Sequence, residues 1–358
     1  MKLLELTAHF KPNVGGVETH IDDLVNTLSK RNFLITVLTY RPLTTRAKWR
    51  IYEKRDGVSI IRIPWIPYFF YMLVSLPLLE FIYLFPGLFL VTPLVLLFKK
   101  PDVIHAHGLV AGFVGVVWGK IFGKRVIIST HSIYSFPKKG MYRNFASWIF
   151  KNANYSLGLS KKAVKEILSL GIDKNKVGSF TYWVDLEKFK RIDNAKIKLN
   201  WRGKFVVLFV GRLISEKGLD ELLESAKNWH QGINLIVIGA GPFESKIRKY
   251  SFKYKNIKFI GIVNQDKLPI YYSGADVLIV PSISEEGFGR VIIEALACGT
   301  PVIGSNRGAI SEAINKDVGH LIDISPENIS QAIGYFYEAR DKLGELASNC
   351  RNLAERRY

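Results

Sequence analysis

Cysteine is scarce in this 358-residue sequence, which contains Cys298 and Cys350 and no others. Two widely separated cysteines provide neither a disulfide framework nor the ligand spacing of a zinc site. This scarcity fits a reducing compartment, so we expect a cytoplasmic protein. The N-terminus, MKLLELTAHFKP, also lacks the long apolar core and the small-residue cleavage site of a signal peptide. It predicts the first strand of a fold.

Several catalytic motifs are missing as well. There is no G-x-x-x-x-G-K-[ST] phosphate loop and no G-x-S-x-G nucleophile elbow. Gly239-Ala240-Gly241 begins a dinucleotide-binding fingerprint, but Glu244 stands where the third glycine is needed. No Asp-x-Asp pair is present to hold a divalent metal on a diphosphate. We therefore expect no metal and no cofactor, and protein cations must neutralise any bound diphosphate. Arg212 and Lys217, which flank a strand–helix turn, suit that task.

Acidic residues are few relative to basic ones, and the imbalance is uneven. The chain has a net charge of +19, and residues 1–190 hold 27 Lys and Arg against 12 Asp and Glu, whereas residues 191–358 hold 23 against 19. A basic N-terminal half predicts an anionic partner surface such as phospholipid, phosphorylated lipid or nucleic acid. Because the aromatic stacking motifs of single-strand binders are not recognisable, no nucleic acid is expected.

The hydrophobic pattern predicts two α/β units. Apolar runs at 3–6, 34–38, 58–63, 101–108 and 125–130 predict strands, and the first is followed by Gly15-Gly16 and an amphipathic helix. A polar segment at 190–204 predicts a linker, and a second series of strands and helices starts at Phe205. The length suffices for two domains, so we expect an α/β protein with domains at 1–190 and 191–358.

Residues 66–98 form an unusually apolar segment. They carry one charge, Glu80, and many aromatic residues, among them Phe69 and Phe70. The length permits a membrane-spanning helix, but four prolines argue against a single straight span. The flanking runs at 58–63 and 103–104 resemble strands of one sheet, which a span would split. The segment therefore predicts helices that lie partly in a membrane surface or form an apolar groove, and an ordinary buried helical pair is the alternative.

Residues 284–304, S-E-E-G-F-G-R-V-I-I-E-A-L-A-C-G-T-P-V-I-G, combine two candidate carboxylates, Glu286 and Glu294, with a predicted anion site. A Gly-Phe-Gly turn precedes an apolar run that opens a helix, and Gly299 fits the C-terminal end of that helix. Unpaired backbone N–H groups and the helix dipole favour a phosphate at such an N-terminus. Glu286 and Glu294 bracket this helix start.

Two histidines follow predicted strands at their carboxyl ends. His107 ends the run P-D-V-I-H-A-H-G, and His131 follows the strand at 125–130. Ligands of open α/β sheets bind outside the carboxyl ends of the strands, so both positions suit a binding site. Their spacing does not indicate a metal pair.

Taken in order, several short motifs resemble the large family of retaining, nucleotide-sugar-dependent glycosyltransferases with the GT-B fold (family four, glycosyl transferases group 1). They are Gly15-Gly16-Val17-Glu18, D-V-I-H-A-H-G at 102–108, Thr130-His131, G-R-L-I-S-E-K-G at 211–218, I-G-A-G-P at 238–242, and E-G-F-G with E-A-L-A-C-G-T-P-V-I at 286–303. Each is weak alone, but their order and spacing are specific and cover nearly the whole chain. The resemblance implies two Rossmann-like doubly wound domains facing a cleft, the first for the acceptor and the second for the donor.

The resemblance also implies roles for the matching residues. Arg212 and Lys217 resemble the pair that grips the donor diphosphate, and Glu294 resembles the carboxylate that holds the ribose hydroxyls. Glu286 resembles the first glutamate of the pair, near the donor sugar, and His131 resembles the histidine beside the reacting carbon. Further donor contacts are implied at Gly16, Gly241, Gly287, Phe288 and Gly289, and acceptor contacts at Glu18, His107 and Trp183.

Two positions depart from the family pattern. Trp183 stands where the family usually has glycine, which predicts a different acceptor pocket. Three residues, rather than the commoner two, separate Pro281-Ser282 from Glu286, which changes the loop near the donor sugar.

The implied activity is retaining, metal-independent transfer of a hexose from a UDP- or GDP-sugar to a hydroxyl of a lipid-linked or membrane-associated glycan. With the basic, apolar N-terminal half, it predicts a cytoplasmic enzyme held peripherally on the inner face of the cell membrane. The alternatives are a nucleotide-sugar epimerase of the same fold and a non-enzymatic basic protein that binds membrane or nucleic acid. For the enzyme, we expect Lys217→Ala and Glu294→Ala each to abolish most transfer and to leave the fold intact.

Overall fold

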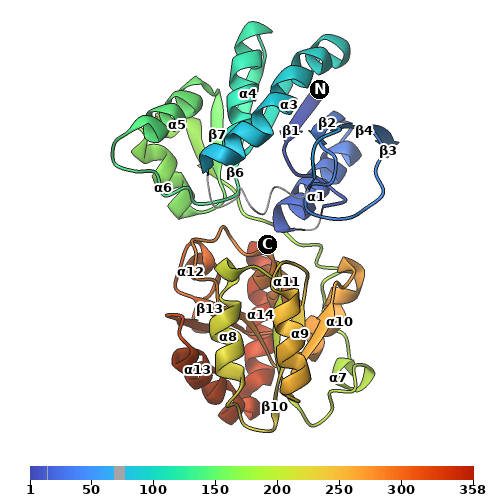
Figure 1. Cartoon of the computed structure of the whole chain (residues 1–358), viewed down its shortest axis with the longest axis vertical. Helices are drawn as coiled ribbons and strands as arrows, with labels where there is room; N and C mark the ends of the chain where they lie inside the picture. Colours follow the sequence, from blue (N-terminus) through green and yellow to red (C-terminus); the bar gives the residue numbers. More distant parts are fainter. Residues whose placement is uncertain (14, 68–76) are drawn as a thin grey trace. The chain divides into compact units, whose positions relative to one another are not determined.

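The computed structural model describes residues 1–13, 15–67 and 77–358, which form two compact units, Met1–Phe180 and Thr181–Tyr358 (Figure 1). Each unit is an α/β layer structure built on a mainly parallel sheet. The predicted class of two Rossmann-like domains is confirmed. The sequence placed the boundary between the domains after residue 190, whereas the structure divides the chain after Phe180.

The N-terminal unit contains β1 (Lys2–Thr7), β2 (Leu34–Tyr40), β3 (Tyr52–Arg55), β4 (Val58–Ile63), β5 (Val103–His107), β6 (Arg125–Thr130), β7 (Tyr155–Gly158) and β8 (Val177–Ser179). Its helices are α1 (Gly16–Lys30), α3 (Pro77–Lys99), α4 (Gly108–Ile121), α5 (Met141–Asn152), α6 (Lys161–Ser169) and the short 3-10 helix η1 (Lys174–Lys176).

These strands join in the order β3-β4-β2-β1-β5-β6-β7-β8, and all neighbours are parallel except β3 and β4. Alternate side chains of each strand pack against helices on opposite faces of the sheet. Leu4 and Leu6 of β1 belong to the core under α3, α4 and α5, whereas Val37 of β2 packs with Ile21 of α1. The chain runs outward from β1 on one side and from β5 on the other, so the topological switch point lies between these two strands.

Helix α3 is the helix that the structure describes within the apolar segment 66–98. Pro86 and Pro93 both lie inside it. Proline at position 93 leaves the Phe89 carbonyl without an intrahelical N–H donor. The indole Nε1 of Trp118 on α4 donates to that oxygen at 2.9 Å. A side chain from the neighbouring helix therefore satisfies the backbone group that the proline leaves.

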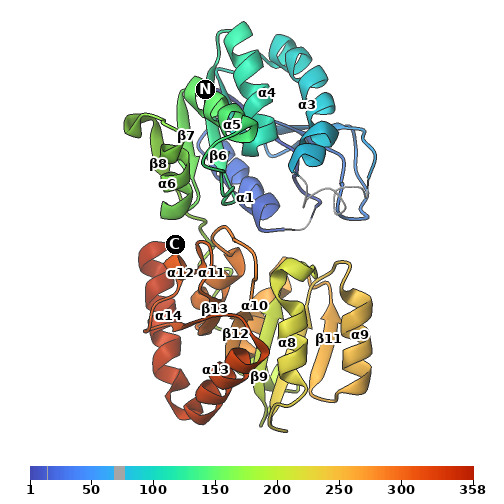
Figure 2. The ribbon, with the colours of Figure 1, turned by 60° about the vertical axis from the view of Figure 1, so that its left-hand side comes forward.

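A second side chain enters α3 one turn earlier. The hydroxyl of Tyr40, at the end of β2, donates to the Leu84 carbonyl and accepts the Leu88 N–H at 3.0 Å. It thus bridges a backbone donor and acceptor that an undisturbed helix would pair directly. Gly87 makes room, because a Cβ there would lie 2.5 Å from the Tyr40 ring. Helix α3 is tied to the sheet as well as to α4, and Figures 1 and 2 both show α3 beside α4.

Helix α3 is apolar on both its buried and its exposed sides. Leu84 and Leu88 are almost fully buried in the core, whereas Leu90 is 68% and Phe98 is 82% exposed. Among the described residues, 78–99 form the one helix long and apolar enough to cross a membrane, a test that core helices also pass. Its strand neighbours β4 and β5 belong to one sheet, as predicted. Residues 68–76, which include Phe69 and Phe70, lie outside the described residues.

The C-terminal unit contains β9 (Phe205–Val210), β10 (Ile233–Ile238), β11 (Ile257–Gly261), β12 (Val277–Val280), β13 (Val302–Ser305) and β14 (Gly319–Ile322). Its helices are α7 (Ala195–Lys198), α8 (Leu219–Ala226), α9 (Glu244–Lys253), α10 (Leu268–Gly274), α11 (Arg290–Ala297), α12 (Ile310–Ala313), α13 (Pro326–Glu338) and α14 (Leu343–Arg357), with 3-10 helices η2 (Ser215–Lys217), η3 (Gln265–Lys267) and η4 (Arg340–Lys342).

These strands form a parallel sheet in the order β11-β10-β9-β12-β13-β14. Helix α8 packs beside α13, and α11 packs beside α14 (Figure 2). Phe205, Val207 and Phe209 of β9 share a core with Leu219 and Leu222 of α8. The chain turns outward in opposite directions from β9 and β12, so the switch point lies between them.

Candidate functional site

The loops that follow β9 and β12 meet at the switch point of the C-terminal sheet. Lys217 of η2, in the first loop, forms an ion pair with Glu286 in the second. The backbone joins them too, because Ile283 N–H donates to the Glu216 carbonyl at 3.0 Å. Two predicted donor-binding residues, 69 positions apart in sequence (217 and 286), are thus brought together at the carboxyl ends of adjacent strands.

Glycines allow these loops to approach one another closely. Gly218 has φ +66°, and a Cβ there would fall 1.9 Å from the Pro281 carbonyl oxygen. Gly241, which was predicted to contact the donor, has φ +155°, and its Cβ would lie 2.4 Å from the Leu213 carbonyl oxygen. The loops after β9, β10 and β12 therefore approach one another closely at these two glycines, where a side chain would clash.

The two cations predicted for the diphosphate have different environments. The Arg212 side chain is exposed, and Lys217 is partly buried. Burial, and next the Arg212 charge, lower the pKa of Lys217 to about 7, while Glu216 acts in the opposite sense. The carboxylate of Glu286, in direct contact, also favours the charged ammonium. A bound anion beside Lys217 would favour its ammonium form and raise this pKa.

Glu286 is held by residues that sequence reasoning missed. The Ser282 hydroxyl donates to its Oε2 at 2.8 Å, across the three-residue spacing noted above. The Ala309 N–H donates to its backbone carbonyl at 3.0 Å, and a Cβ on Gly308 would lie 2.3 Å from that same oxygen. Glu286 is therefore fixed from both its side chain and its backbone.

The Gly-Phe-Gly turn leads into α11 as predicted. Gly289 has φ +65° and precedes the first helical residue, Arg290, and Gly299 has φ +74° just past the helix end. Phe288, predicted as a donor contact, is buried, and its ring packs edge-on against Tyr358 at 5.5 Å. Its side chain anchors the turn in the core, which leaves the backbone of residues 287–289 as the part that can meet a ligand.

Glu294 is buried inside this unit. Its Oε1 accepts from Arg290 Nε at 3.0 Å, and its Oε2 accepts from the Tyr272 hydroxyl at 2.9 Å. Its side chain is 5% exposed, and that of Arg290 is also 5% exposed. Neither partner was predicted. The Glu294–Arg290 spacing of four residues on one helix was visible in the sequence, whereas Tyr272 comes from α10.

The predicted residues of the N-terminal unit lie around the switch point between β1 and β5. His107 Nδ1 and His131 Nε2 are 2.9 Å apart, so the two histidines form a pair, a contact that the sequence did not predict. Gly16 begins α1 and is exposed, whereas Glu18 in its first turn is buried. Trp183 belongs to the C-terminal unit, where it lies partly buried in the segment before α7.

Glu5 is the functional candidate that the sequence did not reveal, because it is embedded in the apolar strand L-L-E-L. It is fully buried and contacts His107 Nε2 at 2.6 Å and His105 Nδ1 at 3.0 Å. Among the described residues, Glu5, His105 and His107 are the one group whose ligand atoms lie close enough to hold a metal, within 4.8 Å of one another. These atoms also lie within hydrogen-bond distance of one another, so the three residues form one buried cluster.

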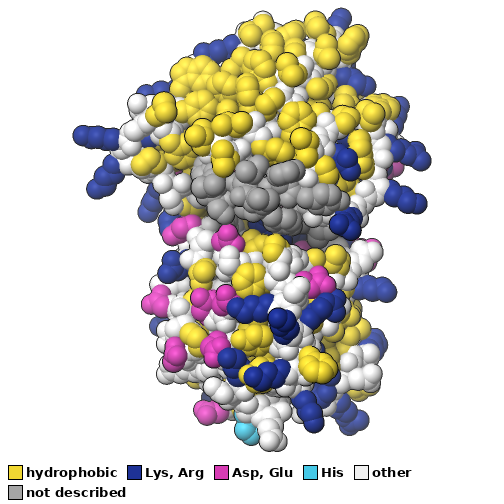
Figure 3. Space-filling view, in the orientation of Figure 1, with side chains coloured by type: hydrophobic (Ala, Val, Ile, Leu, Met, Phe, Trp, Pro, Cys, Tyr) yellow, Lys and Arg dark blue, Asp and Glu magenta, His cyan; other side chains and the backbone are white. Residues whose placement is uncertain are grey.

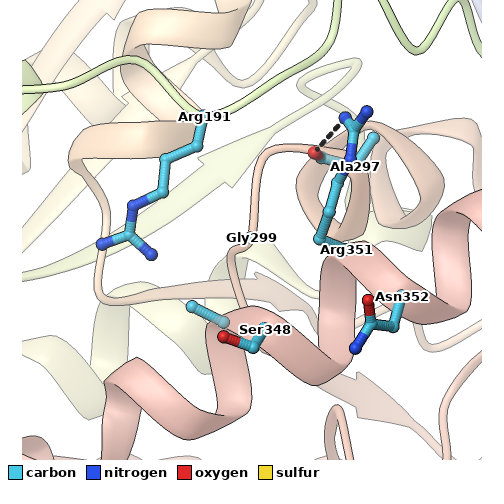
Figure 4. Close-up of a pocket in the computed structure, with 7 residues that line it drawn as sticks. Arg191, Ala297, Gly299, Ser348, Arg351 and Asn352 are labelled. Carbon is cyan, nitrogen blue, oxygen red and sulfur yellow. Dashed lines mark hydrogen bonds between the residues drawn. The ribbon is translucent and has the colours of Figure 1, made fainter.

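Two surface cavities of about 260 and 390 Å³ lie elsewhere in the C-terminal unit. Figure 4 shows the smaller one, where Arg351 donates to the Ala297 carbonyl at 3.0 Å. The larger one is lined by Asp276 and Pro301, which immediately precede β12 and β13. These positions mark the amino ends of the strands, opposite the edge at which ligands of such sheets bind. Neither cavity contains a predicted site residue.

Comparison with known proteins gives matches over both halves of the chain. The family model Glycosyltransferase Family 4 matches residues 14–188, and Glycosyl transferases group 1 matches residues 191–357. A Klebsiella pneumoniae protein described as "Uncharacterized 41.2 kDa protein in cps region" is 31% identical over 286 residues, which are 74% of this chain and 78% of that protein.

A second relative and a solved structure add to these matches. The phosphatidylinositol N-acetylglucosaminyltransferase GPI3 subunit of Saccharomyces cerevisiae is 24% identical over 86% of this chain and 69% of its own length. The crystal structure of Anabaena Alr3699/HepE in complex with UDP-glucose superposes with a TM-score of 0.79 and 20% identity, over 100% of this chain and 95% of that one.

Proposed function

This chain belongs to the glycosyl transferases group 1, and we propose that it is a retaining enzyme that moves a hexose from a UDP- or GDP-sugar to a hydroxyl of a lipid-linked or membrane-associated glycan. Membership in a family of glycosyltransferases replaces the alternative of a non-enzymatic basic binding protein. It also favours transfer over the epimerase of the same fold. We propose the identity of the donor, the class of the acceptor and the retention of configuration at the anomeric carbon.

The pairing of Lys217 with Glu286 at the sheet's switch point carries the proposal. A sugar diphosphate needs a cation beside its phosphates and a polar group beside its sugar. Both are present here on two loops that the backbone links. We propose that the diphosphate binds beside Lys217 and Arg212, with the sugar beside Glu286 and the turn at 287–289. These two cations neutralise the leaving group, so no resident metal is part of the proposal.

Glu294 is proposed to hold the ribose of the donor. Its two oxygens accept from Arg290 and Tyr272. Since each carboxylate oxygen can accept two hydrogen bonds, ribose hydroxyls can share this carboxylate with its protein partners. Arg290 and Tyr272 would then orient Glu294 for the ligand.

The proposed chemistry follows from the charges that develop during transfer. The bond between the anomeric carbon and the diphosphate breaks, the carbon gains positive charge, and the leaving phosphate gains negative charge. Lys217 and Arg212 stabilise that phosphate. The leaving phosphate oxygen takes the proton from the acceptor hydroxyl as the new carbon–oxygen bond forms on the same face. A proton NMR spectrum of the product tests this, since it should show the donor's anomeric configuration. Inversion, or a trapped glycosyl-enzyme adduct, contradicts it.

The exposed side of α3 supports a membrane-associated acceptor. Figure 3 shows hydrophobic side chains gathered over the N-terminal unit. Exposed apolar residues of α3 lie near exposed lysines, among them Lys100 next to the end of α3 and Lys120 near the end of α4. Apolar surface bordered by cations suits an anionic membrane. We propose peripheral binding on the cytoplasmic face, which places lipid-linked acceptors within reach of the enzyme.

A mass-spectrometric screen of nucleotide sugars tests this proposal. The purified chain is incubated with UDP- and GDP-hexoses, with and without a lipid-linked glycan acceptor. We expect one donor to lose its sugar to the acceptor, with release of the nucleoside diphosphate. Conversion of one nucleotide sugar into its epimer, at a rate independent of acceptor, would instead indicate the epimerase.

A further inference from the structure

Four of the seven histidines gather in the N-terminal unit around one buried carboxylate. The cluster lies on the side of the sheet that faces α1. Glu5 Oε2 contacts His107 Nε2 at 2.6 Å, and His107 Nδ1 contacts His131 Nε2 at 2.9 Å. His20 of α1 packs edge-on against the His131 ring at 5.6 Å, and His105 contacts Glu5 from β5. The result is a linear chain from Glu5 through His107 to His131.

The protons of this chain can be assigned from its donors and acceptors. An ionised carboxylate only accepts hydrogen bonds, so His107 Nε2 carries the proton that it shares with Glu5. A neutral imidazole has one N–H, which makes His107 Nδ1 an acceptor. The atom that faces it, His131 Nε2, is therefore the donor. It follows that neutral His131 bears its proton on Nε2 and has an acceptor at Nδ1.

We propose that Glu5 and His107 are positioning residues that hold His131 in this one tautomer and ring orientation for sugar transfer. The proposal rests on the proposed function, sugar transfer, and on the role beside the reacting carbon that the family resemblance implies for His131. The proposal gives a role to Glu5, a buried acid outside the recognised motifs, and to His107, which the resemblance placed among the acceptor contacts.

Burial and charge act together to keep His131 neutral. Burial lowers the pKa of His131 well below its usual value, and His107, His20 and His105 lower it further. Burial and then His105 also lower the pKa of His107, against the effect of Glu5. Burial raises the pKa of Glu5, but His105 and His107 outweigh it and bring it to about 2. The carboxylate is therefore charged and both histidines are neutral at pH 7.

A neutral, oriented His131 suits the proposed reaction. It adds no positive charge beside a carbon that itself becomes positive. Its Nε2–H donates to His107, which in turn donates to the Glu5 carboxylate. This chain of hydrogen bonds raises the electron density at Nδ1 of His131. This is the arrangement in which an imidazole best stabilises a neighbouring positive centre without a proton transfer.

The tautomer can be measured directly by ¹⁵N NMR of protein labelled at histidine, without substrate. At pH 7 we expect His131 to show a protonated Nε2 and an unprotonated Nδ1, with its signals assigned by their loss in His131→Gln. A proton on Nδ1, or on both nitrogens, overturns the proposal. Because the spectrum needs no donor, it decides this point even if the screen finds no transfer, which would count against the proposed function alone.

Variants separate positioning from mere packing. Glu5→Gln should lower kcat on the order of 10–100-fold with little change in the KM for donor, and Glu5→Asp should restore part of it. Asp22→Asn is the matched control, because Asp22 is another buried carboxylate of this unit and pairs with Lys11 and Arg55 rather than with a histidine. It should lower the Tm comparably and change kcat little. Equal losses of kcat in Asp22→Asn and Glu5→Gln would mean a structural role and overturn the proposal. If Glu5→Gln does not fold, the wild-type spectrum still decides.

Discussion

The Lys217 side chain has a lowered pKa and lies at the switch point of the C-terminal sheet. With a pKa of about 7, it has lost much of its charge at pH 8. A bound diphosphate favours the ammonium and raises that pKa again. Donor binding is therefore coupled to protonation of this one side chain.

We predict that donor binding at pH 8 takes up a fraction of a proton, and that donor affinity falls as the pH rises from 7 to 9. Isothermal titration calorimetry in two buffers of different ionisation enthalpy measures the uptake. Lys217→Met should show none. If the methionine variant takes up as much as the wild type, another group is responsible and the assignment of Lys217 is wrong.

Because Glu294 is buried, we expect its replacement to lower the stability of the fold as well as the affinity for donor. Alanine would leave the Arg290 guanidinium buried without its carboxylate, at a cost of about 3–5 kcal/mol in the free energy of unfolding. Glu294→Gln retains one acceptor oxygen, which can serve Arg290, and its new amide NH2 can donate to the Tyr272 hydroxyl. We expect it to fold more stably than Glu294→Ala and to bind donor more weakly than the wild type. Urea unfolding and a donor Kd measure the two effects.

The chain offers a matched control for this pair. Glu244 and Arg248 on α9 have the same four-residue spacing and are exposed. Glu244→Ala should cost less than about 1 kcal/mol, because exposed pairs contribute little. Equal destabilisation by Glu244→Ala and Glu294→Ala would contradict the burial argument. The sequence identified Glu286 and Glu294 as candidates but not the side chains that hold them, since Ser282 and Tyr272 become their neighbours only in the folded chain.

At the scale of elements, α3 shows where sequence reasoning succeeded and failed. The sequence correctly predicts that the strands on either side of the segment join one sheet, and its four prolines argue against a single straight span. Helix α3 nevertheless continues through Pro86 and Pro93. Trp118 and Tyr40 satisfy the backbone groups at and near the prolines, and both come from other elements. Because these partners are distant in sequence, the local sequence could not predict that this helix continues through its prolines.

We predict that the exposed face of α3 contributes to membrane binding. Leu90, Leu94 and Leu97 are each more than half exposed. Their joint replacement by serine should lower binding to anionic liposomes more than tenfold, since burying a leucine side chain is worth about 1.5–3 kcal/mol. Donor binding should be retained. Co-sedimentation with liposomes measures the effect.

Phe252 provides the control for the α3 variant, because it is 95% exposed on α9 in the C-terminal unit. Phe252→Ser should leave liposome binding unchanged. Sedimentation of the α3 variant at the wild-type level would contradict peripheral binding through this helix.

For the whole molecule, the order of motifs predicted two Rossmann-like units and the family, and both are confirmed. Strand-end positions also placed His107 and His131 at the ligand-binding edge, and the resemblance placed Lys217 and Glu286 in one donor site. The direct contacts within each of these two pairs were not predicted. The antiparallel edge strand β3 was missed, because its residues, Y-E-K-R, are mostly charged and lack an apolar pattern. Glu5 was missed for the opposite reason, since one acid within an apolar strand reveals nothing until its partners are known.

The central claim is that the loops after β9 and β12 hold the donor diphosphate. The most direct test compares sugar transfer by the wild type, Lys217→Ala and Lys246→Ala, each with a Tm. Lys246 pairs with Asp220 on the surface and serves as the control. We predict that Lys217→Ala loses on the order of 10²–10³-fold in kcat at a Tm near that of the wild type, while Lys246→Ala transfers normally. Wild-type turnover in Lys217→Ala would contradict the account.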